Sequence, residues 1–125
     1  MQPEQVVIQL WNRIAAHDWQ GVGQLLAPDI RLTWPATGEV FVGRDNFVAI
    51  QSEYPEGWTI NLISTVTQGD IVVSEVEVPH EKYGVFRAAS FWTVRNEKIT
   101  NATEYWVTVD GEQAPEWRSR YSQAH

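Results

Sequence analysis

The sequence predicts a single α+β domain in which three helices cover one face of a long, curved, mostly antiparallel sheet. Apolar residues near the N-terminus recur with helical spacing, whereas from residue 58 to residue 109 the period changes to two, as in strands. The last four predicted strands are joined by short connections, which favours an antiparallel meander. The length of 125 residues fits one domain, spanning residues 1–125.

Three segments are predicted to be helices. The first covers residues 3–17 and begins with Pro3, which suits a first helical turn. Its apolar face consists of Val6, Val7, Leu10, Trp11 and Ile14. Asp18 is placed to cap a short second helix that ends before Pro28. Asp45 is placed to cap a third helix over residues 46–54.

Six segments are predicted to be strands. Two short ones, residues 30–34 and 39–43, are separated by the turn-like sequence PATG. Four longer ones cover residues 58–67, 70–78, 85–94 and 98–109. Residues 110–125 are polar and are interrupted by Pro115, so we expect them to form a loosely attached C-terminal arm.

Composition argues against several classes of function. The formal net charge is −7 and the nine Lys and Arg residues are scattered, so a nucleic-acid partner is not expected. The first 18 residues have neither a basic start nor an uninterrupted apolar run, so a membrane partner is not expected either. The chain has no cysteine, which suits the cytoplasm. Its three histidines are widely separated, and no metal site is predicted.

The last predicted strand carries a carboxylate beside large aromatic residues. In the sequence ITNATEYWVTV, Glu104 precedes Tyr105 and Trp106. Alternation places Tyr105, Val107 and Val109 on one face of the strand, and Glu104 with Trp106 on the other. Because the first face is the more apolar, alternation taken alone would bury that face and leave Glu104 in water.

Three segments together resemble the SnoaL-like branch of the nuclear transport factor 2-like superfamily, which includes polyketide cyclases and ketosteroid isomerase. They are AAHDWQGVGQLLAPDI, PATGEVFVGRDNFVAI and FWTVRNEKITNATEYW, and their order and spacing extend the resemblance over nearly the whole chain. The resemblance implies a cone-shaped α+β barrel. In this fold a strongly curved sheet wraps around the three N-terminal helices, with a deep apolar pocket between them.

The resemblance also implies that the outer face of the sheet forms a homodimer interface, so that both faces of the last strand are covered. Tyr105 and Val107 would then meet a second subunit. Glu104 would face the pocket, where SnoaL-like cyclases carry a single acid/base carboxylate.

Ketosteroid isomerase chemistry is not expected from the same comparison. Its three catalytic groups have no counterpart here, because Leu10, Trp34 and Ser90 stand at the corresponding positions. Glu104 is therefore the one residue that we can assign as an acid/base. An alternative role for Glu104 is structural, in which it bonds to a pocket Trp or Ser and keeps the cavity in shape.

The candidate site is a cavity around Glu104, with Ser90 as a second catalytic residue. Ser90, together with Tyr54, is expected to donate hydrogen bonds to developing negative charge. Desolvation by apolar walls should raise the pKa of Glu104, as a general acid/base near neutral pH requires. The residues expected to bind the ligand are Leu10, Ile14, Trp34, Ile50, Tyr54, Ser74, Trp92 and Trp106.

These expectations describe a protein that binds a small apolar or cyclic molecule and acts on it without a cofactor, as an isomerase, cyclase or hydrolase. Two alternatives stay open because one fold can serve many functions. The first is a non-catalytic protein that binds a hydrophobic ligand. The second is a module whose purpose is dimeric association.

Two histidines and two outward carboxylates complete the predictions. His80, in the loop sequence PHEKYG, is expected to be solvated, and His17 is expected to interact with the end of the first helix. Glu75 and Glu77 alternate with apolar residues and are expected on the outer face of the sheet.

Overall fold

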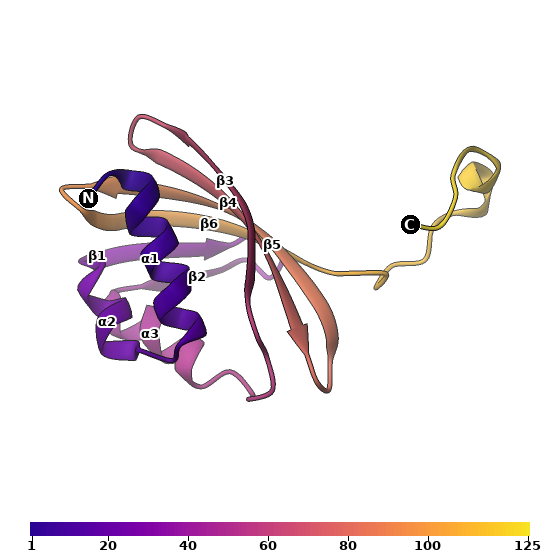
Figure 1. Ribbon diagram of the computed structural model, residues 1–125. Coiled ribbons are helices and arrows are strands. Elements are labelled where there is room, and N and C mark those ends of the chain that lie inside the picture. The colour runs from indigo at the N-terminus through magenta and orange to yellow at the C-terminus, as the bar shows by residue number, and fades with distance from the viewer.

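The computed structural model describes residues 1–125 and shows an α+β fold with its helices on one side of a curved sheet (Figure 1). The helices are α1 (Pro3–Ala15), α2 (Trp19–Gln24) and α3 (Arg44–Ser52). The strands are β1 (Leu26–Trp34), β2 (Glu39–Val42), β3 (Asn61–Gln68), β4 (Ile71–His80), β5 (Gly84–Arg95) and β6 (Lys98–Thr108). A short 3-10 helix, η1 (Glu116–Tyr121), lies in the C-terminal arm.

The six strands form one sheet in the order β2-β1-β6-β5-β4-β3. The pairs β1–β2, β3–β4, β4–β5 and β5–β6 are antiparallel, and β1–β6 is parallel. The sheet is strongly curved but does not close, and the helices lie within its concave side (Figure 1). The predicted cone with three N-terminal helices is therefore confirmed.

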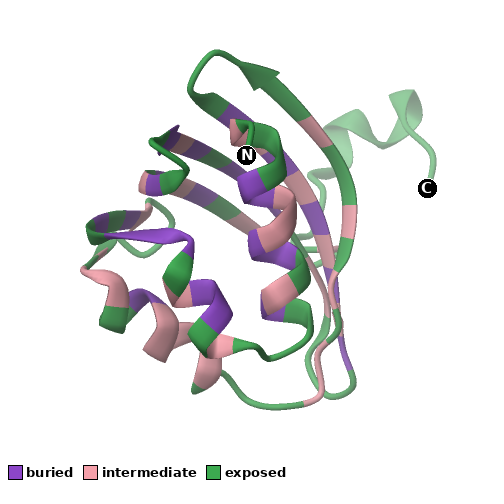
Figure 2. Ribbon diagram, turned by 60° about the vertical axis from the view of Figure 1, so that its left-hand side comes forward, coloured by how far each residue is buried: buried purple, intermediate pink, exposed green.

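Helix α1 supplies a large part of the core. Its predicted apolar face is buried and joins residues from the strands in one cluster of 19 buried side chains. Figure 2 shows these buried stretches along the side of α1 that faces the sheet. Full burial of each such side chain contributes roughly 1.5–3 kcal/mol, so this face fixes α1 against the sheet.

The junction between α1 and α2 is built as predicted around Asp18. Its carboxylate accepts a hydrogen bond from the Gly21 N–H at 3.0 Å and caps α2. A Cβ atom at Gly21 would lie only 2.1 Å from Asp18 Oδ2, so the cap requires a glycine here.

Some element bounds differ from the prediction. Strand β1 begins at Leu26 rather than at residue 30, and its register against β6 shifts between Leu26 and Arg31. Strand β3 begins at Asn61, because residues 58–60 contribute only an isolated bridge to β4. Helix α3 is capped by Gly43 at φ +96°, so Asp45 lies in its first turn and is not the cap.

The outer face of the sheet carries exposed apolar side chains. Phe91 on β5 and Tyr105 on β6 pack edge to face with ring centroids 6.1 Å apart, and each is about half exposed. Val107 on β6 is also exposed. On the same side of the sheet Glu77 pairs with Arg87 at 2.9 Å. This face is covered by nothing within the chain.

The C-terminal arm, residues 110–125, runs away from the rest of the molecule (Figures 1 and 2). All of its residues are exposed and none joins the core. Trp117 and Tyr121 in η1 are among the most exposed aromatic side chains. None of the helices has the length and apolar character that crossing a membrane would require.

Candidate functional site

Glu104 lies on the concave side of β6 and is 2% exposed. Its carboxylate accepts three hydrogen bonds from side chains. Trp34 Nε1 donates to Oε1 at 3.0 Å, and Trp106 Nε1 donates to the same oxygen at 3.4 Å. Ser90 Oγ donates to Oε2 at 2.7 Å. The side chain therefore points into the cone. The solvated Glu104 that strand alternation alone predicts is wrong.

Glu104 belongs to a row of polar side chains that crosses the concave face of the sheet. Ser74 on β4 pairs with Ser90 on β5, and Ser90 pairs with Glu104 on β6. Ser74 Oγ accepts hydrogen bonds from Trp11 Nε1 at 3.0 Å and from Trp92 Nε1 at 2.8 Å. Indole N–H groups thus satisfy both ends of the row, which lets three polar side chains lie in an otherwise apolar interior.

Burial sets the protonation chemistry of the site. It raises the pKa of Glu104 above its ordinary value of 4.5, because the charged form loses its water. The hydrogen bonds from Ser90, Trp34 and Trp106 act in the opposite direction, since they favour the carboxylate. None of the ion pairs of the protein includes Glu104. The carboxylate therefore has dipolar partners but no counter-charge.

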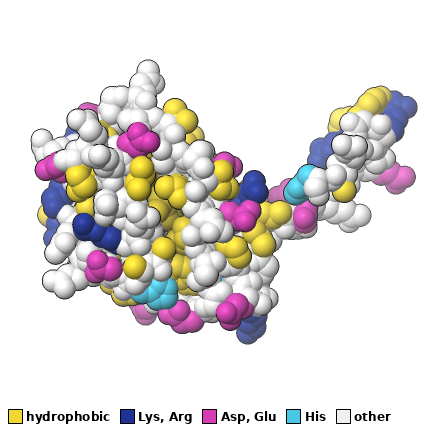
Figure 3. Space-filling view, viewed as in Figure 1, with side chains coloured by type: hydrophobic (Ala, Val, Ile, Leu, Met, Phe, Trp, Pro, Cys, Tyr) yellow, Lys and Arg dark blue, Asp and Glu magenta, His cyan; other side chains and the backbone are white.

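A cavity of about 290 Å³ opens beside Glu104, close to the lower size of known ligand pockets. Eleven of its 14 lining residues are hydrophobic. Figure 3 shows hydrophobic side chains reaching the surface in the middle of the main body of the molecule, on the face turned to the viewer. The lining residues are Trp11, Ile14, Trp34, Ala36, Thr37, Ile50, Gln51, Tyr54, Trp58, Ile60, Val78, Phe86, Glu104 and Trp106.

Several residues predicted to form the site do lie at this cavity. They are Ile14, Trp34, Ile50, Tyr54, Glu104 and Trp106. Leu10, Ser74 and Trp92 do not line it, because they are buried where α1, which carries Leu10, packs on the sheet. Trp92 packs there edge to face against Trp11, with ring centroids 5.8 Å apart. Their predicted placement as cavity lining is corrected accordingly.

Ser90 also lies behind the cavity wall. It is fully buried, and its hydroxyl proton is directed to Glu104 Oε2 rather than to the cavity. The expectation that Ser90 faces a ligand is therefore corrected. The hydroxyl holds the carboxylate, which makes Ser90 a positioning residue.

The segment of residues 53–60, here called the strap, connects α3 to β3 and supplies Tyr54, Trp58 and Ile60 to the cavity. Three backbone or bridge contacts hold it to the hairpin between β4 and β5. Thr59 N–H of the strap donates to Pro79 O at 3.1 Å, and Glu81 N–H of the hairpin donates to Gly57 O of the strap. Trp58 also forms a bridge with His80.

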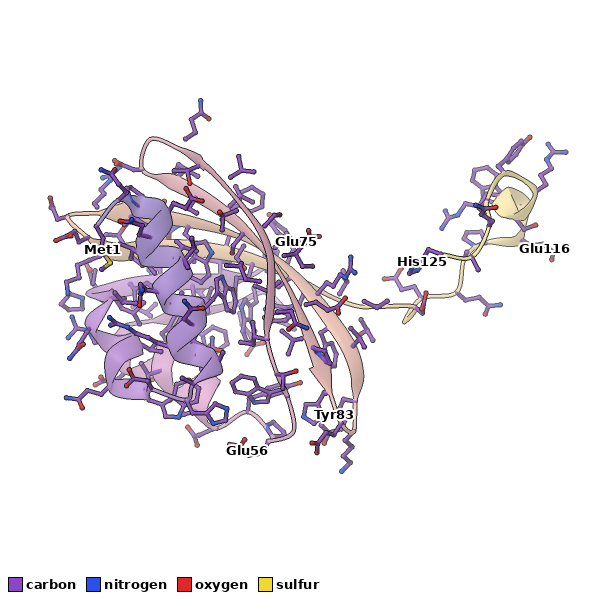
Figure 4. All side chains as sticks on the ribbon, viewed as in Figure 1. Met1, Glu56, Glu75, Tyr83, Glu116 and His125 are labelled. Carbon is purple, nitrogen blue, oxygen red and sulfur yellow. The ribbon has the colours of Figure 1, made fainter.

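His80 fastens the strap with its side chain. Nδ1 accepts a hydrogen bond from the Lys82 N–H at 3.0 Å, so the ring proton resides on Nε2, which lies 3.1 Å from Pro55 O and donates to it. His80 is only 7% exposed. The prediction that it is solvated is therefore wrong, because the strap covers it. In Figure 4 Glu56 of the strap and Tyr83 of the hairpin lie at the same end of the molecule.

His17 follows α1 and its backbone N–H donates to Ile14 O at 3.0 Å, as expected for a residue at the end of this helix. Its ring has a further contact that the sequence did not indicate. It stacks on Trp58 and on Trp19, with centroids 4.7 and 5.4 Å away. The indole Nε1 of Trp58 is buried without a hydrogen-bond partner. The stacking of His17 on Trp58 thus holds the strap against the end of α1.

Sequence reasoning missed part of the cavity lining. Phe86 shares the concave face of β5 with Ala88 and Ser90, so alternation could have identified it. Trp11 lies one helical turn from Ile14 and could have been assigned in the same way. The strap has neither a helical nor a strand period, so apart from the predicted Tyr54 the contributions of its residues, such as Ile60, had no comparable signal.

The sequence pattern of the SnoaL-like domain family matches residues 7–102. The chain therefore belongs to this family of small α+β domains. No curated protein sequence matches it significantly.

Solved structures agree with this assignment at the level of the fold. A Kribbella flavida protein named for ketosteroid isomerase is 19% identical, with a TM-score of 0.91 over 99% of this chain and 90% of that one. A nuclear transport factor 2-like protein of unknown function from Burkholderia xenovorans is 22% identical, with a TM-score of 0.80 over 98% of this chain and 94% of that one. A Shewanella denitrificans protein named for SnoaL-like polyketide cyclases is 13% identical, with a TM-score of 0.71 over 84% and 90%.

Proposed function

We propose that the cavity binds a small, mostly apolar molecule and that Glu104 transfers a proton to or from it without a cofactor. The single observation that carries this proposal is a buried carboxylate without a counter-charge, set in the wall of an apolar cavity. A structural role would be served as well by a neutral side chain, at a lower cost of desolvation. A carboxylate kept at such a cost is typical of a functional site.

The hydrogen bonds of Glu104 define how it would act. Both indoles occupy Oε1, and Ser90 occupies one position on Oε2. Oε2 therefore keeps an acceptor position for a proton of the bound molecule. Because burial raises the pKa of Glu104, the carboxylic acid that forms is stable enough to return the proton to another atom of the same molecule. This sequence of steps is an isomerisation or a ring closure.

Stabilisation of the developing negative charge is assigned to the cavity itself. Thr37, Gln51 and Tyr54 are its lining residues with side-chain donors besides the tryptophans. Tyr54 retains the role that the sequence suggested for it. The hydroxyl of Ser90 is engaged by Glu104 and supports the base instead.

Deuterium exchange tests proton transfer without knowledge of the natural substrate. Cyclic ketones such as 2-tetralone would be incubated with the protein in D₂O, and incorporation next to the carbonyl followed by NMR. We expect exchange above the buffer rate with the wild type and with Glu75→Gln, a matched charge change on the outer side of the sheet (Figure 4). Exchange should be lost in Glu104→Gln. Equal rates for Glu104→Gln and the wild type would contradict the catalytic role.

A non-catalytic binding protein is the second candidate, favoured by the small number of donors in the cavity wall. Tryptophan fluorescence separates it from the first. A binding protein would show saturable changes with a cyclic ketone, reduced affinity in Trp106→Ala, and no exchange of the bound compound.

We also propose that the protein is a homodimer through the outer face of the sheet around Tyr105 and Val107. The exposed apolar side chains of this face support the proposal. Light scattering should give twice the chain mass of 14.3 kDa. Val107→Glu should shift the protein toward the monomer, whereas Asn12→Glu, the same charge change on exposed α1 surface, should not. A monomeric wild type would contradict the dimer.

A further inference from the structure

The cavity wall has a negative group and many aromatic rings but no positive group, a combination that a neutral ligand does not explain. Its wall contains one carboxylate, that of Glu104, and no lysine, arginine or histidine. The other titratable group in the wall is the phenol of Tyr54. Any charge that enters with a ligand therefore meets a negative site without a competing cation.

Six aromatic side chains surround the same space. They are Trp11, Trp34, Tyr54, Trp58, Phe86 and Trp106. The face of an indole ring carries negative electrostatic potential and attracts cations more strongly than the faces of other aromatic rings. Four of the six rings are indoles. A cavity for hydrocarbon alone could be lined entirely by aliphatic side chains, whereas here the aromatic residues outnumber the five aliphatic ones.

The hydrogen bonds to Glu104 favour a cation that has at most one N–H group to donate. The indoles of Trp34 and Trp106 and the hydroxyl of Ser90 already supply N–H and O–H donors to the carboxylate. A primary ammonium would need further acceptors for its remaining protons, and the wall offers few. A quaternary ammonium has no N–H and needs only proximity to the negative charge and to ring faces. A tertiary ammonium has a single N–H, for which Glu104 Oε2 keeps an acceptor position.

The overall charge acts in the same direction. With a formal net charge of −7, the protein attracts small cations from solution and repels anions. A cavity of about 290 Å³ accommodates a small molecule with an alkylated nitrogen but not an extended polyamine chain.

We propose that the molecule bound in this cavity carries a tertiary or quaternary ammonium group, held between the indole walls and the Glu104 carboxylate. The inference rests on the proposed function only in that the cavity binds a small molecule. It adds the chemical class of that molecule, an alkylated amine.

A bound cation also explains how Glu104 works as a base. Burial favours the neutral acid in the empty cavity, whereas a positive charge nearby favours the carboxylate. Binding of an ammonium ligand would thus shift Glu104 toward the carboxylate at the moment when the base is needed. The proton released would pass to solvent, so binding and proton release are coupled.

An isosteric pair of probes tests the proposal. Choline and 3,3-dimethylbutan-1-ol have the same shape, but the second carries a neutral carbon in place of the nitrogen. Calorimetry and tryptophan fluorescence with the wild type should show choline binding about tenfold or more tighter. The affinity for choline should rise with pH as Glu104 ionises, and that for the alcohol should not. Choline binding should release protons, seen as a dependence of the heat on the buffer.

Variants then assign the preference to the carboxylate. In Glu104→Gln the ratio of the affinity for choline to that for the alcohol should fall to a few-fold, while the alcohol still binds. In the matched Glu75→Gln this ratio should stay unchanged. If Glu104→Gln is unfolded by circular dichroism, the pH dependence and proton release of the wild type decide the question. Absence of choline binding, equal affinity for the two probes, or a preference that survives Glu104→Gln would overturn the inference.

The two proposals fail in different ways. Binding of cyclic ketones without binding of choline would overturn the ammonium inference and leave the proposed function standing. Binding of choline without exchange of any ketone would support the inference and remove only the ketone chemistry. No binding of either class would overturn both.

Discussion

Trp34 and Glu104, 70 residues apart in the sequence, meet with the indole Nε1 3.0 Å from the carboxylate Oε1. The parallel pairing of β1 with β6 brings the two side chains together on the concave side of the sheet. The contact ties the N-terminal part of the sheet to the residue on which the proposed chemistry depends. The hydrogen bonds around Glu104 therefore govern both stability and ionisation.

The stability of the protein should depend on pH through Glu104. Its pKa is raised in the folded state, so the folded protein binds this proton more tightly than the unfolded chain does. The advantage is fully present below the unfolded value of 4.5 and is lost as the pH rises through the folded pKa. Urea unfolding across this range should show the free energy of unfolding of the wild type falling relative to that of Glu104→Gln. A constant difference between the two would contradict the raised pKa.

Ser90→Ala should raise the pKa of Glu104 further, because the Ser90 hydroxyl favours the carboxylate. It should also destabilise the protein by about 1–3 kcal/mol, since a buried carboxyl group loses a hydrogen-bond partner. Carbon-detected NMR and urea unfolding measure the two effects. Ser64→Ala, at an exposed position of β3, should leave both unchanged. An unchanged pKa in Ser90→Ala would show that Ser90 does not position the carboxylate.

Two tryptophans provide a matched test of the buried polar row. Trp92→Phe deletes the hydrogen bond to Ser74, whereas Trp58→Phe deletes an N–H group that has no partner. Both changes remove the same atoms. Trp92→Phe should therefore cost roughly 1 kcal/mol or more beyond the cost of Trp58→Phe. Thermal and urea unfolding compare them, and the reverse order would show that the Ser74 bond contributes little.

The strap should open more readily when its side-chain fastening is removed. His80→Ala deletes the bond to Pro55 O and the acceptor for the Lys82 N–H. Hydrogen exchange at residues 53–60 should become faster, while exchange in α1 should stay as in the wild type. Lys82→Ala retains both bonds of His80 and serves as the control. Equal exchange of the strap in His80→Ala and Lys82→Ala would contradict the fastening role.

The fold was predictable because its signals are local. The apolar face of α1, the cap at Asp18 and the alternation in β4, β5 and β6 are each contained in a short stretch of sequence. The inward direction of Glu104 was not local, since alternation alone placed it in water. It followed from the resemblance, which implied a cone with both sheet faces covered.

The depth of side chains within the cone could not be read in the same way. Alternation assigns Ser74, Ser90 and Trp92 to the concave face but does not say how far along the strand the cavity begins. Helix α1 determines this, because it covers that part of the sheet and Trp11 fills the space against Trp92. The cover over His80 also depends on a segment without periodicity, the strap, whose path only tertiary contacts define.

The pKa of Glu104 in the wild-type protein tests the central claim most directly. Carbon-detected NMR titration gives this value, and the spectrum of Glu104→Gln assigns the resonance. A buried carboxylate in an apolar cavity without a counter-charge predicts a pKa clearly above 4.5. A value at or below 4.5 would mean that the carboxylate is hydrated or fully compensated, and would contradict its role as the acid/base of the site.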